Sequence, residues 1–150
     1  MNNEEMDKIK IRRMAFTDVD AVLALNSKLI EADSQINYID LASVALTSPL
    51  DMSLVCEIGR TIIGFILARR VYSGIPVQEL CNIHAILVET DYRKHGIGRR
   101  LVNEVISHCK KEGIRRVRTL VDESNSEVKQ FFESLGFRRS NFVNYDRAPD

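Results

Sequence analysis

Hydrophobic residues recur along this chain with two different periods, and each change of period marks the start of a new element. Alternation over a few residues is typical of a strand, whereas a spacing of three or four residues is typical of an amphipathic helix. In chain order the patterns predict a strand over residues 8–13, a helix that starts near Thr17, a short helix over residues 38–46, strands over residues 53–58 and 61–68, a loop over residues 71–76, a strand within residues 77–88, a helix over residues 97–112, a strand over residues 117–121, a helix that ends at Gly136 and a closing strand over residues 142–146.

Turn and cap residues support several of these boundaries. Gly59-Arg60 separates two apolar runs and predicts a two-residue hairpin turn. Ser124 and Glu127 have the spacing of a capping box at the start of the last helix. The order of elements is typical of an α/β fold, in which helices cover both faces of a mixed sheet. A length of 150 residues predicts a single domain over residues 1–150.

Composition and charge narrow the function classes. Lys plus Arg and Asp plus Glu both total 21, and this balance argues against a nucleic-acid-binding surface. Cys56, Cys81 and Cys109 are widely spaced, which favours buried free thiols in a reducing compartment over disulfides or a metal site. We find no apolar run of about 18 residues, and the N-terminus is acidic and polar. A cytoplasmic protein without a membrane span is therefore expected.

The most informative segment joins the strand that ends at Val88 to the helix that follows it. Its sequence is Arg93-Lys94-His95-Gly96-Ile97-Gly98-Arg99. Glycine lets an anion approach the unpaired N–H groups of a first helical turn, where the helix dipole adds positive charge. The segment therefore predicts a phosphate cradle. It lacks the residues of a P-loop or of a dinucleotide fingerprint. The alternative is a tight turn with a solvated basic face.

These residues resemble the acetyl-CoA-binding motif of the GNAT superfamily of N-acetyltransferases. Arg-x-x-Gly-x-Gly follows a strand that ends Ile86-Leu87-Val88, and an apolar helix follows the glycines. Asn125 and the run from Phe131 to Phe137 are similar to the later turn and helix end of that family. The resemblance covers about residues 82–145. It implies a three-layer GNAT-like fold whose central mixed sheet has splayed strands and helices on both faces.

The resemblance also implies how acetyl-CoA would bind. In similar proteins the pantetheine arm pairs with exposed strand backbone, here that of Ile86, Leu87 and Val88, which is a form of strand addition. The pyrophosphate then lies on a cradle with Arg93 beside it, made by Lys94, His95, Gly96, Ile97, Gly98 and Arg99. Asn125 matches a residue that contacts the cofactor arm, although Asn is also common at a helix start.

The catalytic residues of the family are replaced in part. His84 lies where many similar proteins have a glutamate base, and imidazole can take a proton from an ammonium group near neutral pH. It could equally be a structural histidine. Glu89 is a second candidate base, or a solvated carboxylate. The oxyanion of the reaction would lie near the N–H of Val88.

Phe132 stands where the family often has a tyrosine acid. It could pack in the core or line the cofactor arm. The acid could then be Tyr145, Tyr92 or water, or the thiolate could leave unaided.

The resemblance thus predicts an acetyl-CoA-dependent N-acetyltransferase. The expected acceptor is a primary amine of a small molecule, a peptide N-terminus or a lysine, which attacks the thioester directly. The alternatives are a non-catalytic acyl-CoA-binding sensor and a nucleotide-binding regulator. Expected partners are acetyl-CoA, an amine and a candidate second copy in a homodimer, with no nucleic acid, membrane or metal. Glu31, Asp33 and Asp40 would suit a cationic acceptor, or form a solvated face.

Overall fold

The computed structural model describes residues 1–30 and 51–150. The predicted helix over residues 38–46 and the candidate acceptor residues Glu31, Asp33 and Asp40 lie outside them. The described elements are α1 (Asn3–Asp7), β1 (Ile9–Arg13), η1 (Phe16–Asp18), α2 (Val19–Leu29), β2 (Leu54–Ile58), β3 (Thr61–Ser73), β4 (Gln78–Val88), η3 (Thr90–Tyr92), α4 (Ile97–Lys111), β5 (Val117–Thr119) and α5 (Ser126–Ser134). No helix among the described residues has the length and apolar character needed to span a membrane.

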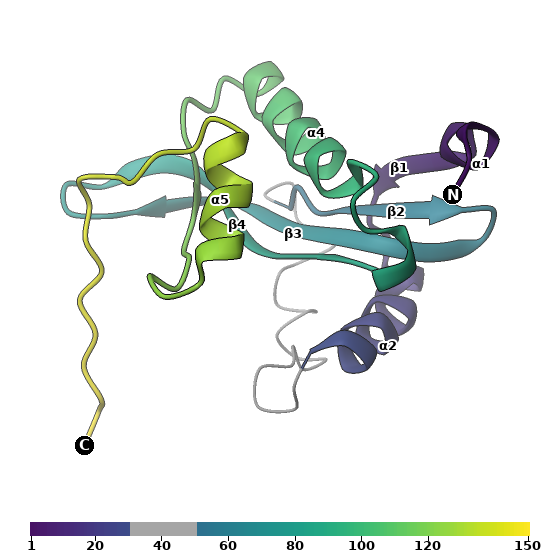
Figure 1. Ribbon diagram of the computed structural model, residues 1–150. Coiled ribbons are helices and arrows are strands. Elements are labelled where there is room, and N and C mark those ends of the chain that lie inside the picture. The colour runs from purple at the N-terminus through teal and green to yellow at the C-terminus, as the bar shows by residue number, and fades with distance from the viewer. Residues whose placement is uncertain (31–50) are drawn as a thin grey trace.

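The strands form one mixed sheet in the order β1-β2-β3-β4-β5. The first four strands pair antiparallel, and β5 pairs parallel with β4. Helices α4 and α5 cover one face of the sheet, and α2 lies against the other (Figure 1). The predicted α/β fold, a mixed sheet with helices on both faces, is confirmed.

Each face of the sheet has its own hydrophobic core. The α4 face buries residues such as Leu101, Val105 and Phe132 against the strands. The α2 face buries a smaller set that includes Val22 and Phe65. Cys56, Cys81 and Cys109 are buried free thiols, as the sequence predicts. Burial also raises the pKa of Cys56 to about 11, which keeps that thiol protonated and unreactive.

A β-bulge in β4 changes which residues face each core. Ala68 pairs with Ile83 and Leu67 pairs with Ala85, so His84 is an extra residue in the strand. Before the bulge Ile83 belongs to the α4-face core, whereas after it Ala85 belongs to the α2-face core. Side chains alternate along a strand, so Asn82 and His84 both point to the α2 face.

Several predicted boundaries are wrong. The first half of the loop predicted over residues 71–76 is strand, because β3 and β4 pair as far as Ser73 and Gln78, and the turn begins only at Gly74. Asn125, rather than Ser124, is the N-cap of α5. The predicted closing strand over residues 142–146 does not form among the described residues, and the end of the chain extends away from the sheet (Figure 1). Helix α1, whose capping box joins Asn2 and Glu5, was not predicted.

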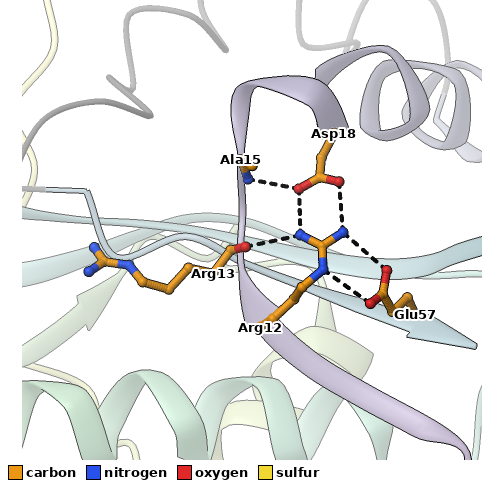
Figure 2. Close-up of polar contacts among 5 residues, drawn as sticks. All are labelled: Arg12, Arg13, Ala15, Asp18 and Glu57. Carbon is orange, nitrogen blue, oxygen red and sulfur yellow. Dashed lines mark hydrogen bonds and ion pairs between the residues drawn. The ribbon is translucent and has the colours of Figure 1, made fainter. Parts of the chain in front are cut away.

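A charged cluster connects the first strand to the start of α2 (Figure 2). The guanidinium of Arg12 donates to both carboxylate oxygens of Asp18, at 2.7 and 2.9 Å, and to both of Glu57, at 3.1 and 3.0 Å. Asp18 also accepts from the N–H of Ala15 at 2.7 Å. The bonds from Arg12, followed by the backbone bond, lower the pKa of Asp18 although burial opposes this. The cluster therefore stabilises the fold in the state with Asp18 ionised.

Asp18→Asn should lower the free energy of unfolding by about 2 kcal/mol at neutral pH, because it removes a charge-assisted pair from a partly buried arginine. A lowered carboxyl pKa contributes stability above the unfolded value, near pH 4, and this contribution is lost as the pH falls further. The difference between wild type and variant should therefore shrink in acid. Urea denaturation across this range measures it, with exposed Asp20→Asn as the matched control. A difference that stays constant to the lowest pH would contradict this account.

Candidate active site

The site begins where β4 and β5 separate. Their pairing covers only Cys81 to Ile83 and Val117 to Thr119, whereas β4 continues to Val88. The Thr119 hydroxyl donates to the Ile83 carbonyl at 3.2 Å and closes the paired end. Beyond this point β4 still pairs with β3, but its other edge has no strand partner in the described chain. The splayed strands implied by the family resemblance are therefore present.

The turn after β4 brings an unpaired helix N-terminus to the same place. Lys94 and Gly96 have φ values of 64° and 78°, so the backbone is left-handed at both positions. Gly96 is the N-cap of α4 and has no side chain to cap the helix. The N–H groups of Ile97, Gly98 and Arg99 therefore point out of the first turn without an intrahelical partner. This geometry supports the predicted anion cradle.

Two of the basic side chains near this turn make structural contacts. Arg93 Nε donates to the carbonyl of Val88 at 2.8 Å and so holds the turn against the end of β4. Arg99 donates to the hydroxyl of Ser134 at 3.3 Å and connects α4 to α5. Lys94 is exposed, and His95 is half-buried. The backbone is thus better placed than Arg93 to bind an anion.

The two glycines of the turn have different roles. A Cβ on Gly96 would meet no atom within 4 Å, so this glycine is needed for its backbone conformation and for open space. A Cβ on Gly98 would lie 3.3 Å from the ring of Phe131. Gly98 therefore also permits close packing of α4 on α5, a reason that the sequence pattern did not reveal.

His84 lies at the bulge with its side chain exposed on the α2 face. Its Nδ1 is 3.1 Å from Nδ2 of Asn82, and the direction of this bond depends on the imidazole tautomer. Partial burial, followed by the charge of Arg69, lowers the pKa of His84. This shift favours the neutral imidazole, which is the form that can accept a proton.

Glu89 is less accessible than His84 to an amine that must give up a proton. Its carboxylate accepts from Lys28 Nζ at 2.8 Å, and 16% of its side-chain surface is exposed. The pair connects the end of α2 to the end of β4. A role for Glu89 as base stays a prediction.

The remaining candidates lie in structural positions. Phe132 is 5% exposed and packs edge-to-face between Phe131 and Phe137, which leaves little surface for a ligand. Asn125 accepts from the N–H of Val128 at 3.1 Å, so the helix-cap interpretation is confirmed and the cofactor contact stays a prediction. Tyr145 is 90% exposed on the extended C-terminal segment. This structure does not bring Tyr145 to the site, because the strand expected to position it is absent.

Asn82 and Arg118 were missed by the sequence reasoning. They are direct neighbours on β4 and β5. The alternation around Ile83 placed Asn82 on the same face as His84, and this signal could have identified it. Arg118 had no comparable signal, because an arginine in a short strand is usually solvated.

The sequence matches the acetyltransferase (GNAT) family over residues 21–137. It is 35% identical over 94 residues to an uncharacterized N-acetyltransferase of Methanocaldococcus jannaschii, covering 62% of this chain and 42% of that protein. It is 34% identical over 64 residues to the ribosomal protein bS18-alanine N-acetyltransferase of Escherichia coli, covering 43% of each. The chain thus spans less than half the length of these relatives.

Solved structures show the same fold. The aminoglycoside acetyltransferase AAC(6')-Iy, in complex with a CoA-containing bisubstrate analog, superposes with a TM-score of 0.80 at 19% identity, over 95% of this chain and 99% of that one. The aminoglycoside 6'-N-acetyltransferase AAC(6')-Ih of Acinetobacter baumannii superposes with a TM-score of 0.78 at 18% identity, over 95% and 99% of the two chains.

The environment of His84 leads to a spectroscopic prediction. Its imidazole should titrate below the ordinary histidine value of about 6.5, because partial burial and Arg69 both disfavour the charged form. Arg69→Gln should move the midpoint upward, since it removes the second of these causes. Ring NMR signals followed against pH measure both effects, with His108 on α4 as an internal reference. An unchanged midpoint in the variant would show that Arg69 does not act on His84.

Proposed function

The chain belongs to the acetyltransferase (GNAT) family, and we propose that it transfers the acetyl group of acetyl-CoA to a primary amine. One observation carries this proposal: the edge of β4 that has no partner among the described strands is followed, after η3 and the glycine turn, by an uncapped helix N-terminus. The first feature binds an extended amide-containing arm and the second binds a diphosphate. Acetyl-CoA carries both groups in one molecule.

We place the cofactor along β4. The amide groups of the pantetheine arm pair with the backbone of Ile86, Leu87 and Val88, where β5 has already separated. The pyrophosphate lies on the N–H groups at the start of α4, with Gly96 leaving room for it. The thioester then lies toward the bulge at His84.

His84 is the base in this proposal. The acceptor arrives as an ammonium group and loses a proton to the imidazole, whose lowered pKa favours its neutral form. The free amine attacks the thioester carbon, and the oxyanion is stabilised near the N–H of Val88. The carbon–sulfur bond then breaks, the nitrogen loses its remaining extra proton to water, and the acetyl group stays on the nitrogen as an amide.

The leaving thiolate takes its proton from water or leaves unaided. Phe132 has no proton to donate and is buried, and Tyr145 is exposed far along the C-terminal segment. A thiolate is a tolerable leaving group, because thiols titrate near pH 8.5. A dedicated acid is thus not required.

A non-catalytic acyl-CoA sensor is the second candidate, because Phe132 replaces the tyrosine acid of the family. Release of thiol from acetyl-CoA, measured with a panel of amines, separates the two functions. The panel should include aminoglycosides and peptides with N-terminal alanine, which the names of related proteins indicate.

Gly96→Ala should weaken CoA binding at least about tenfold, equivalent to ~1.4 kcal/mol. The new Cβ disfavours the left-handed backbone at φ 78° and occupies the open space where the diphosphate would lie. Gly59→Ala is the matched control, since Gly59 has a φ of 60° and equally open surroundings in the distant β2–β3 turn. Calorimetry with CoA should show wild-type affinity for Gly59→Ala and reduced affinity for Gly96→Ala. Equal affinity in both folded variants would place the diphosphate elsewhere.

His84→Ala should lower kcat by roughly 10²-fold and leave CoA affinity unchanged. The acid limb of the pH–rate profile should also disappear, because the group that must be deprotonated is gone. His108→Ala, on α4, controls for loss of a histidine. A wild-type rate and profile in His84→Ala would assign the proton transfer to Glu89 or to water.

A further inference from the structure

We propose that the guanidinium of Arg118 binds a carboxylate of the acceptor, so that the acceptor is an amine that also carries a carboxylate group. This inference rests on the acetyl transfer proposed above and specifies its substrate class.

Arg118 lies in a polar row on the α2 face. Arg69 on β3, Asn82 on β4 and Arg118 on β5 are paired directly across the sheet. Val117 packs in the α4-face core, so the next residue along β5 points to the opposite face. All three side chains are partly exposed, and a ligand on this face can reach them.

The row lies beside the proposed reaction centre. Asn82 Nδ2 is 3.1 Å from His84 Nδ1, and β5 separates from β4 one residue after Arg118. Neighbouring strands are about 5 Å apart, and alternate residues on one strand are about 7 Å apart. One small molecule can therefore place an amine at His84 and a carboxylate at Arg118.

One nitrogen of the Arg118 guanidinium is buried without a hydrogen-bond partner. Its Nη2 has no hydrogen bond, and the side chain forms no ion pair with any residue that the structure describes. Among the described residues, Arg70 Nε is a second buried cationic atom without a hydrogen bond, but it has Glu79 at 3.6 Å. A buried donor on a charged group is costly unless it is satisfied. A ligand carboxylate would satisfy Nη2.

Phe142 makes a cation–π contact with Arg118. Cζ of Arg118 lies over the ring of Phe142, 5.1 Å from its centroid. Such a contact holds the guanidinium by its charge and occupies none of its N–H donors. An arginine fork held in this way matches the two oxygens of a carboxylate. The phosphates of acetyl-CoA are expected at the opposite end of β4, so the carboxylate is assigned to the acceptor.

The principal test compares amino acids with their carboxamides in the thiol-release assay. Wild type should prefer the carboxylate form by at least about tenfold in kcat/KM, which is ~1.4 kcal/mol. Arg118→Gln should abolish the preference, mainly by raising KM for the carboxylate form, since the contact is made equally in the ground and transition states. Arg60→Gln, in the exposed β2–β3 turn, removes the same charge and should behave as wild type.

A binding measurement separates failure of this inference from failure of acetyl transfer. N-acetyl amino acids and their amides are titrated into the protein–CoA complex and followed by calorimetry. Binding of the carboxylate forms that Arg118→Gln weakens would support the anion site even if no amine is acetylated. Turnover without preference for the carboxylate, or equal binding of both forms by a folded Arg118→Gln, would overturn the inference and leave acetyl transfer intact. Absence of both turnover and carboxylate binding would overturn both proposals.

Discussion

The organisation of this protein depends on the unequal pairing of strand β4. One edge of β4 is bonded to β3 along nearly its whole length, so the strand is fixed in the sheet. Its other edge is bonded to β5 over three residues only. A strand with unpaired backbone normally invites aggregation. Here the unpaired stretch lies next to the N-terminus of α4, where Gly98, Phe131 and Ile86 bring helix and strand close together. The unpaired backbone of β4 is therefore limited to a short stretch beside the first turn of α4.

Beyond the bulge at His84, the edge of β4 and its α2 face present different chemical groups. The edge beyond Ile83 presents backbone N–H and C=O groups, which suit a cofactor arm that is the same in every reaction. The α2 face offers the side chains of Asn82 and His84, which can vary without altering the sheet. A bulge turns side chains while the flanking strand stays paired. This separation explains how one fold can keep its cofactor and change its acceptor.

Sequence reasoning succeeded where a pattern was long or chemically specific. Helix α4 was found from its apolar stripe, and the glycine turn from its residues and from the family they resemble. It failed where contacts between segments far apart in the sequence determine the local structure. The bulge at His84 has no local signature, and the alternation near Phe142 predicted a strand that pairs with none of the strands the structure describes. The burial of Phe132 between two other rings could not be predicted either, because it depends on how α5 packs on the sheet and on α4.

Arg12 and Arg118 show how the same side chain can serve stability or binding. Arg12 is bonded to two carboxylates of its own chain, so its charge is satisfied before any ligand arrives. Arg118 makes a cation–π contact with Phe142, and its buried Nη2 has no hydrogen-bond partner among the described residues. Natural proteins satisfy most buried donors, and the exceptions call for a physical reason. If the fold alone were optimised, an uncharged residue at position 118 would avoid the cost of the unpaired donor. Retaining arginine there is reasonable when a ligand anion completes the site, because the cost is then removed on binding and contributes to selectivity.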